Sequence, residues 1–310
     1  MTKFAFVFPG QGSQAVGMLE GFAGNDVVRQ TIAEASDAID LDLAKLIAQG
    51  PKEDLDLTTN TQPVMLSSSV AFYRAWIAAG GAVPEVVAGH SLGEFSALVA
   101  AGVIEFKDAV RLVRFRAQAM QEAVPVGQGG MAAILGLSDE EVAAACQEAA
   151  QGEVVGPVNF NAPSQVVIAG HKGAIERACE AAKARGAKRA LVLPVSAPFH
   201  SSLLKPASDR LREYMAGLNF SAPKIPLINN VDVEILNDPE AIKDALVRQA
   251  ASPVRWVETI RKMASMGMTH VIECGPGRVL AGLSRRIDAS LTGDAIYDQA
   301  SLEKMIEALK

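Results

Sequence analysis

A five-residue turn, Gly89–Gly93 with the sequence Gly-His-Ser-Leu-Gly, limits the possible folds of this chain more than any other feature. It follows the apolar residues Val86 and Val87 and precedes a segment, 94–101, that favours helix. Gly-x-Ser-x-Gly between a strand and a helix is the pattern of a nucleophile elbow, which strains its central serine and exposes the hydroxyl at the top of a sheet. We therefore interpret Ser91 as a candidate nucleophile. The alternative is a turn of small residues with an incidental serine.

The rest of the chain alternates between expected strands and helices. Lys3–Phe8 is a short apolar stretch, typical of a buried first strand, and Phe106–Glu122 has the spacing of an amphipathic helix. Such alternation predicts an α/β fold with a mainly parallel sheet and helices on both of its faces. Further elements are expected as a helical region to about Ala48, a helix near Val64–Ala79, and strands at Ile225–Asn229 and His270–Glu273.

The middle of the chain follows a different order. Expected strands and helices there run β-α-β-β-α-β, at residues 131–137, 139–150, 154–160, 165–169, 172–185 and 189–195. This order is that of the ferredoxin-like unit. Turn-forming residues bracket the segment on both sides. We therefore predict a small domain at residues 126–195, inserted into a large domain that residues 1–125 and 196–310 form.

Composition excludes several classes of protein. The chain has 310 residues, of which 49% are hydrophobic, but no apolar run reaches the ~20 residues needed to span a membrane. A net charge of −6 argues against nucleic acid as the main partner. The N-terminal residues lack the pattern of a signal peptide, and the three cysteines are an odd number without metal-ligand spacing. We expect a cytoplasmic protein with no metal site and no membrane association.

A serine nucleophile needs a base, and the chain has four histidines. His90 is adjacent to Ser91 and should point away from it, whereas His171 fits a surface turn and His270 a core strand. His200 lies in a loop beyond the strand 189–195, where it can reach a neighbouring site. The alternative is a histidine at a helix entry with no chemical role.

The sequence does not single out a carboxylate that would orient this histidine. Glu94 is close to the serine, but an acidic residue is also favourable in the first turn of a helix. A backbone carbonyl is the other candidate.

Arg116 lies on the apolar face of the predicted helix Phe106–Glu122, among residues such as Leu112, Val113 and Met120. A guanidinium remains charged, so on an apolar face it requires a partner. One interpretation is a structural ion pair with a carboxylate of the chain itself. The other is a clamp for the carboxylate of a substrate.

Taken together, several motifs resemble the malonyl-coenzyme A:acyl carrier protein transacylases, the malonyltransferase family of fatty acid synthesis. The resemblance covers essentially the full chain. The segments that carry it are Phe8–Gln14, Gln62-Pro63, Gly89–Glu94, Arg116 with Met120-Gln121, Asn159–Asn161, Phe199-His200 and Gly275–Gly277.

The resemblance implies a fold and a role for each matching residue. The fold is an α/β-hydrolase-like large domain with a ferredoxin-like small one. Ser91 would be the nucleophile and His200 the base, with the backbone carbonyl of Gln249 orienting the histidine. Gln11 and Leu92 would supply the N–H groups of an oxyanion hole, the second of which the elbow itself also predicts. The resemblance also implies a substrate-binding set: Arg116, which would hold the malonyl carboxylate, with Gln62, Met120, Asn159, Asn161 and Phe199.

The implied reaction moves a malonyl group from malonyl-coenzyme A to acyl carrier protein by a ping-pong route through Ser91. It uses no metal or other cofactor, and we expect a monomer. Three alternatives remain at this stage. They are an acyltransferase that serves a polyketide synthase, a serine thioesterase or esterase with water as acceptor, and a non-catalytic protein that keeps the fold.

Overall fold

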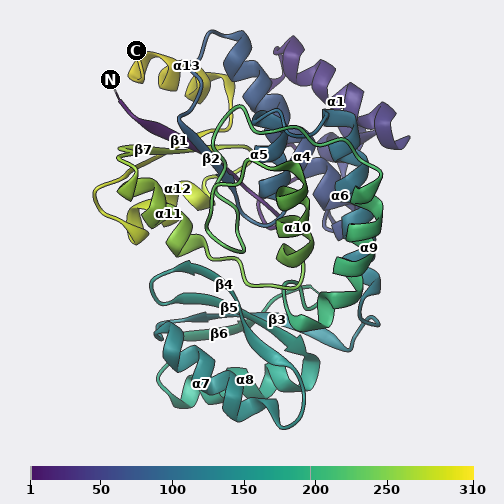
Figure 1. Ribbon diagram of the computed structural model, residues 1–310, viewed down its shortest axis with the longest axis vertical. Helices are drawn as coiled ribbons and strands as arrows, with labels where there is room; N and C mark the ends of the chain where they lie inside the picture. Colours follow the sequence, from purple (N-terminus) through teal and green to yellow (C-terminus); the bar gives the residue numbers. More distant parts are fainter. Residues whose placement is uncertain (1, 196) are drawn as a thin grey trace.

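The computed structural model describes residues 2–195 and 197–310, which form an α/β structure with two separate sheets (Figure 1). The first sheet is parallel throughout and has the strand order β2-β1-β7-β8. Its strands are β1 (Phe4–Phe8), β2 (Val86–Gly89), β7 (His270–Cys274) and β8 (Thr292–Ile296). The mainly parallel α/β sheet predicted from the sequence is thereby confirmed.

Helices cover both faces of the parallel sheet, which explains why all five residues of β1 are buried. Alternate residues of β1 enter different clusters, because successive side chains of a strand point to opposite faces. Phe4, Phe6 and Phe8 pack mainly against helices from the first half of the chain, whereas Ala5 and Val7 pack against helices from the second half.

The helices around this sheet come from both halves of the chain. In the first half they are α1 (Asp26–Ile39), α2 (Leu43–Gln49), α3 (Lys52–Leu55), α4 (Thr58–Ala78), α5 (Gly93–Ala100) and α6 (Phe106–Glu122). In the second half they are α9 (Lys205–Ala216), α10 (Pro239–Gln249), α11 (Trp256–Ser265), α12 (Val279–Ile287) and α13 (Gln299–Ala308).

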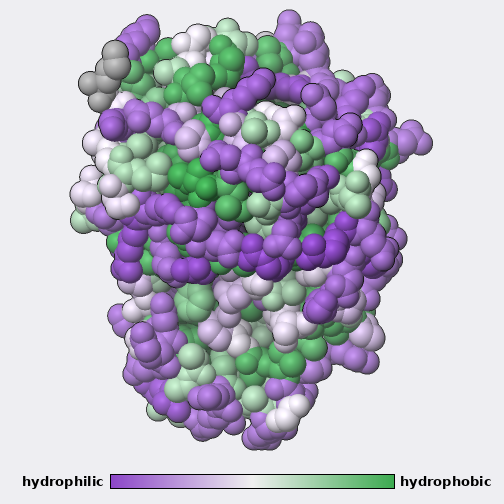
Figure 2. Space-filling model, in the orientation of Figure 1, coloured by the Kyte–Doolittle hydropathy of each residue, from purple (hydrophilic) through white to green (hydrophobic). Residues whose placement is uncertain are grey.

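The second sheet is antiparallel and forms the lower part of the molecule in Figure 1. Its order is β4-β5-β3-β6, with strands β3 (Gly129–Leu135), β4 (Val155–Ala162), β5 (Gln165–His171) and β6 (Arg189–Val192). One face packs on α7 (Asp139–Ala150) and α8 (Lys172–Ala184). The other face packs on α6 and on the segment that carries Phe199. Figure 2 shows a hydrophilic band across the molecule between the two parts.

Two expected elements differ from the structure. Helix α4 begins at Thr58 and contains Pro63, six residues before the helix start that the sequence predicts. The expected strand Ile225–Asn229 forms only isolated bridges, which pair Val87 with Leu227 and Ile228 with Ile235. Pro226 has no N–H to donate, so this segment cannot extend a ladder. Within residues 2–195 and 197–310, no helix has the length and apolar character that crossing a membrane requires.

Candidate active site

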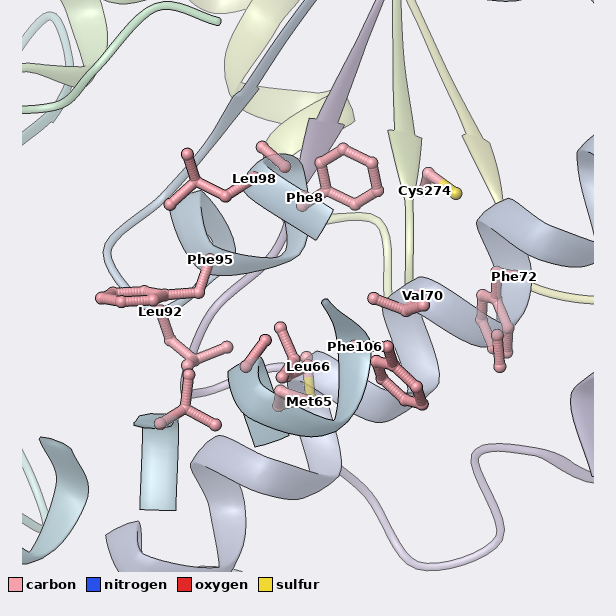
Figure 3. Packing of buried hydrophobic residues seen from close by; sticks show 14 of the residues in the cluster. Phe8, Met65, Leu66, Val70, Phe72, Leu92, Phe95, Leu98, Phe106 and Cys274 are labelled. Atoms are coloured by element: carbon pink, nitrogen blue, oxygen red, sulfur yellow. The ribbon is translucent and has the colours of Figure 1, made fainter. Parts of the chain in front are cut away.

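The predicted elbow forms at the carboxyl end of β2. Ser91 joins β2 to α5 with a φ of +51°, in the left-handed region that strains a residue with a side chain. A Cβ atom on Gly93 would lie 2.0 Å from the carbonyl oxygen of Phe8, and one on Gly89 would lie 1.9 Å from the backbone of Gly93. Glycine is therefore required at both flanks. Leu92 and Phe95 anchor the turn in the apolar core (Figure 3).

Asn230 braces the elbow from a segment far away in sequence. Its Oδ1 accepts a hydrogen bond of 2.8 Å from the backbone N–H of Ser91, and its Nδ2 donates one of 2.7 Å to the carbonyl of Gly89. Asn230 is fully buried. The sequence analysis missed this residue, because a single asparagine after a short extended segment carries no recognisable signal.

Ser91 and His200 lie within hydrogen-bond distance, with 2.7 Å between Oγ and Nε2. The other ring nitrogen, Nδ1, is 2.8 Å from the backbone carbonyl oxygen of Gln249. A carbonyl only accepts, so Nδ1 carries the proton and Nε2 is free to accept one from the serine. Burial, and after it the positive charge of Arg116, lower the pKa of His200 to about 3. The imidazole is therefore neutral at neutral pH.

Arg116 is 1% exposed, yet in the described part of the chain it forms no salt bridge with a carboxylate. Its guanidinium donates 2.8 Å and 2.9 Å hydrogen bonds to the side-chain oxygens of Gln62 and Gln249, and a 3.2 Å bond to Ser91 Oγ. The structural ion pair considered above is therefore wrong. Burial lowers the pKa of Arg116 to about 10, so the group stays charged at neutral pH.

A cavity of about 550 Å³ opens onto Ser91, His200 and Arg116. Residues around the parallel sheet and residues of the antiparallel sheet, Met131 and Asn159, both contribute to its wall. Other lining residues that the sequence analysis named are Gln11, Gln62, Leu92, Met120, Asn159 and Phe199.

Two of the predicted site residues do not line this cavity. Asn161 instead lies with its Oδ1 2.7 Å from Nε2 of His90, so the imidazole of His90 has Asn161 as its partner. Gln249 lies behind Arg116 and His200. The two remaining histidines are half-buried and lie elsewhere, so the expectation that His270 is a core residue is wrong.

The loop after β1 passes directly over the elbow. A Cβ atom on Gly10 would lie 2.6 Å from the carbonyl oxygen of His90. This close approach brings Gln11 to the wall of the cavity, which Leu92 also lines. No described residue accepts a hydrogen bond from the backbone N–H of Gln11 or of Leu92. The side-chain oxygen of Gln11 accepts a 2.9 Å hydrogen bond from Thr58.

The site has the parts of an acyl transfer centre, and comparisons with known proteins agree. A family model described as the acyl transferase domain matches residues 5–295. The malonyl CoA-acyl carrier protein transacylase of Escherichia coli strain K12 is 56% identical over 99% of this chain and 100% of its own length. The corresponding protein of Bacillus subtilis is 43% identical over 100% of this chain and 98% of its own length.

Solved structures agree closely. An acyl-carrier-protein S-malonyltransferase from Burkholderia pseudomallei is 67% identical, with a TM-score of 0.97 over 99% of this chain and all of its own. A malonyl-transacylase solved in complex with its type II PKS acyl-carrier protein is 54% identical, with a TM-score of 0.98 over the same shares. The chain belongs to the acyl transferase family and, within it, to the malonyl CoA-acyl carrier protein transacylases.

Proposed function

We propose that the protein transfers a malonyl group from malonyl-coenzyme A to the phosphopantetheine thiol of acyl carrier protein, by way of an ester on Ser91. The proposal rests on the burial of Arg116 and on its hydrogen-bond partners. A buried, charged guanidinium beside the nucleophile has only neutral partners. Such a group favours a substrate that brings its own carboxylate, which a malonyl group does and an acetyl group does not.

In the first half of the reaction, His200 Nε2 takes the proton of Ser91 Oγ while the oxygen attacks the thioester carbonyl. The backbone N–H groups of Gln11 and Leu92 stabilise the negative charge that develops on the carbonyl oxygen. The carbon–sulfur bond breaks, and the proton on Nε2 passes to the sulfur of coenzyme A. Malonyl-Ser91 remains.

In the second half, the carrier thiol gives its proton to His200 Nε2, and its sulfur attacks the ester carbonyl. The bond between that carbon and Ser91 Oγ breaks, and the serine recovers its proton from the imidazole. Throughout, the carbonyl of Gln249 holds the Nδ1–H and so fixes the tautomer that the base requires.

The other lining residues shape the acyl site. Gln62 holds one end of the Arg116 guanidinium, while Met120, Asn159 and Phe199 bound the space around the acyl chain. Asn161 acts indirectly, because its side chain orients His90 within the elbow.

The architecture supports the two-domain division proposed from the sequence. Residues 126–195 hold the antiparallel sheet with α7 and α8, while 1–125 and 196–310 hold the parallel sheet and its helices. The order β4-β5-β3-β6 with two helices on one face supports a ferredoxin-like small domain. The strand-elbow-helix arrangement around Ser91 supports a hydrolase-like large one. Three buried free cysteines fit a reducing cytoplasm.

The relatives' names favour the carrier of fatty acid synthesis as acceptor. The neighbour solved with a type II PKS acyl-carrier protein supports a polyketide carrier as the second candidate. Transfer rates to the two purified carriers distinguish them.

The proposal is tested with Arg116→Ala, measured with malonyl-coenzyme A and acetyl-coenzyme A. We expect the ratio of malonyl to acetyl transfer to fall about 100-fold, which corresponds to two lost charge-assisted hydrogen bonds. Arg114→Ala is the matched control. It lies on the same helix, but its side chain donates to the backbone carbonyl of Ile39, away from the cavity. Equal losses for both substrates, or release of free malonate in place of transfer, would contradict the proposal.

A further inference from the structure

A buried carboxylate, Glu94, lies behind the elbow and outside the proposed mechanism. It is 2% exposed and sits in the first turn of α5, directly after the serine turn. Its Oε2 accepts a 2.9 Å hydrogen bond from Nε2 of Gln249 and a longer one, 3.4 Å, from the backbone N–H of Asn230. A helix-capping role alone does not explain these contacts, because both partners belong to the second half of the chain.

The side chain of Gln249 connects Glu94 with Arg116. Its Oε1 accepts the 2.9 Å hydrogen bond from Arg116, and its Nε2 donates to Glu94 and, at 3.0 Å, to the carbonyl of Ser91. Nε2 also lies 3.4 Å from Asn230 Oδ1. If the amide were turned over, its NH₂ group would face the guanidinium and its oxygen would face these three acceptors. Glu94 Oε2 is the nearest of these acceptors to Nε2, so its position helps most to fix which end of the amide faces Arg116.

This arrangement keeps a carboxylate close to Arg116 without letting it bind the guanidinium. A carboxylate in direct contact would compete with the carboxylate of a substrate. The intervening amide supplies a neutral oxygen instead, which orients the guanidinium and leaves it able to bind an anion. Burial raises the pKa of Glu94 itself to about 7. In its ionised form Glu94 raises the pKa of the Arg116 guanidinium, against the larger effect of burial.

We propose that Glu94 is a positioning residue for Arg116, acting through the side-chain amide of Gln249, and that it thereby sets the preference for acyl groups that carry a carboxylate. The inference rests on the proposed function. It predicts that the reach of the residue 94 side chain toward Gln249 matters more than its charge.

Two substitutions separate reach from charge. Glu94→Asp keeps the charge but withdraws the carboxylate by one methylene, whereas Glu94→Gln keeps the reach and offers a neutral oxygen to Gln249. KM and kcat are measured for malonyl-coenzyme A and acetyl-coenzyme A, and thermal unfolding shows that each variant is folded. For Glu94→Asp we expect kcat/KM for malonyl transfer to fall about tenfold, mainly through KM, with acetyl transfer changed less than about twofold. For Glu94→Gln we expect malonyl transfer within about threefold of wild type.

Glu273→Asp is the matched control. Glu273 is also a fully buried carboxylate, but it lies on β7 and accepts a hydrogen bond from the backbone of Ala281 in α12. Shortening it removes a buried contact without touching Gln249 or Arg116, so the malonyl-to-acetyl ratio should stay at the wild-type value.

Three results would overturn the inference: an unchanged malonyl-to-acetyl ratio in Glu94→Asp, an equal loss for both substrates, or a loss in Glu94→Gln as large as in Glu94→Asp. Failure of the proposed function looks different, because the wild-type protein itself would then not transfer malonyl groups to the carrier.

Discussion

The two sheets of this molecule bury different kinds of residue. Around the carboxyl end of the parallel strand β2, the structure buries charged and polar groups in hydrogen-bond contact with one another, among them Glu94, Arg116, His200, Asn230 and Gln249. The antiparallel sheet packs on α7 and α8 through an apolar cluster. It contributes to the cavity only wall residues such as Met131 and Asn159.

The difference follows from strand direction. Carboxyl ends of parallel strands meet at one edge, where the following turns bring side chains from distant parts of the chain together. An antiparallel sheet has no such edge, so its cavity-facing surface shapes the site without holding the reacting groups. Substitutions at the elbow should therefore affect chemistry, and substitutions beneath the antiparallel sheet should affect stability.

The largest expected effect comes from Gly93→Ala. The added Cβ would lie 2.0 Å from the carbonyl oxygen of Phe8, so the elbow must move and Ser91 with it. A displacement of about 1 Å at a reacting atom costs about 100-fold in rate, and we expect at least that loss in malonyl loading. Gly130→Ala in the antiparallel sheet is the control, because a Cβ there meets nothing within 4 Å. Comparable activity in the two variants would contradict the claim that the elbow, and not the antiparallel sheet, positions the reacting groups.

A smaller effect on catalysis, but a large one on stability, is expected from Ile168→Ala. Ile168 is 1% exposed and belongs to the apolar cluster beneath the antiparallel sheet. The cavity left behind should cost about 2–5 kcal/mol in the free energy of unfolding, measured by chemical denaturation. The turnover number per folded molecule should remain within about twofold of wild type. A tenfold loss of turnover in folded protein would show that this core also positions the chemistry.

The smallest expected effect is that of pH on His200, whose protonation state should not change near neutral pH. Burial makes the imidazolium unfavourable, so the pKa falls to about 3, below the ordinary value of 6.5. The ring should therefore stay neutral, with the proton on Nδ1, from pH 8 down to about pH 5. NMR of the histidine ring nitrogens measures this directly. A titration of His200 with a midpoint near pH 6.5 would show that the site is wetter and less buried than the structure indicates.

The elbow and the arginine could be predicted from sequence because their signals are local. Gly-x-Ser-x-Gly sits between a recognisable strand and helix, and Arg116 interrupts an apolar face with a regular period. The order of elements in the middle of the chain was likewise readable and led to the predicted antiparallel unit.

The supporting residues could not be predicted in the same way. Asn230 and Gln249 reach Ser91 only because α10 and the loop before it fold back over the elbow, more than 130 positions later in the chain. The expected strand Ile225–Asn229 was wrong because its proline prevents a continuous ladder, although its apolar residues are those of a strand. Neither the long-range contacts of Asn230 and Gln249 nor the missing ladder produces a periodic pattern in the sequence.

The central claim is that Ser91 carries the acyl group. The most direct test is intact-protein mass spectrometry of the wild-type protein and Ser91→Ala after mixing with malonyl-coenzyme A, without carrier. We expect the mass of one malonyl group on the wild-type protein alone, and its loss when acyl carrier protein is added. Absence of the adduct from wild type during turnover, or its presence on Ser91→Ala, would contradict the account.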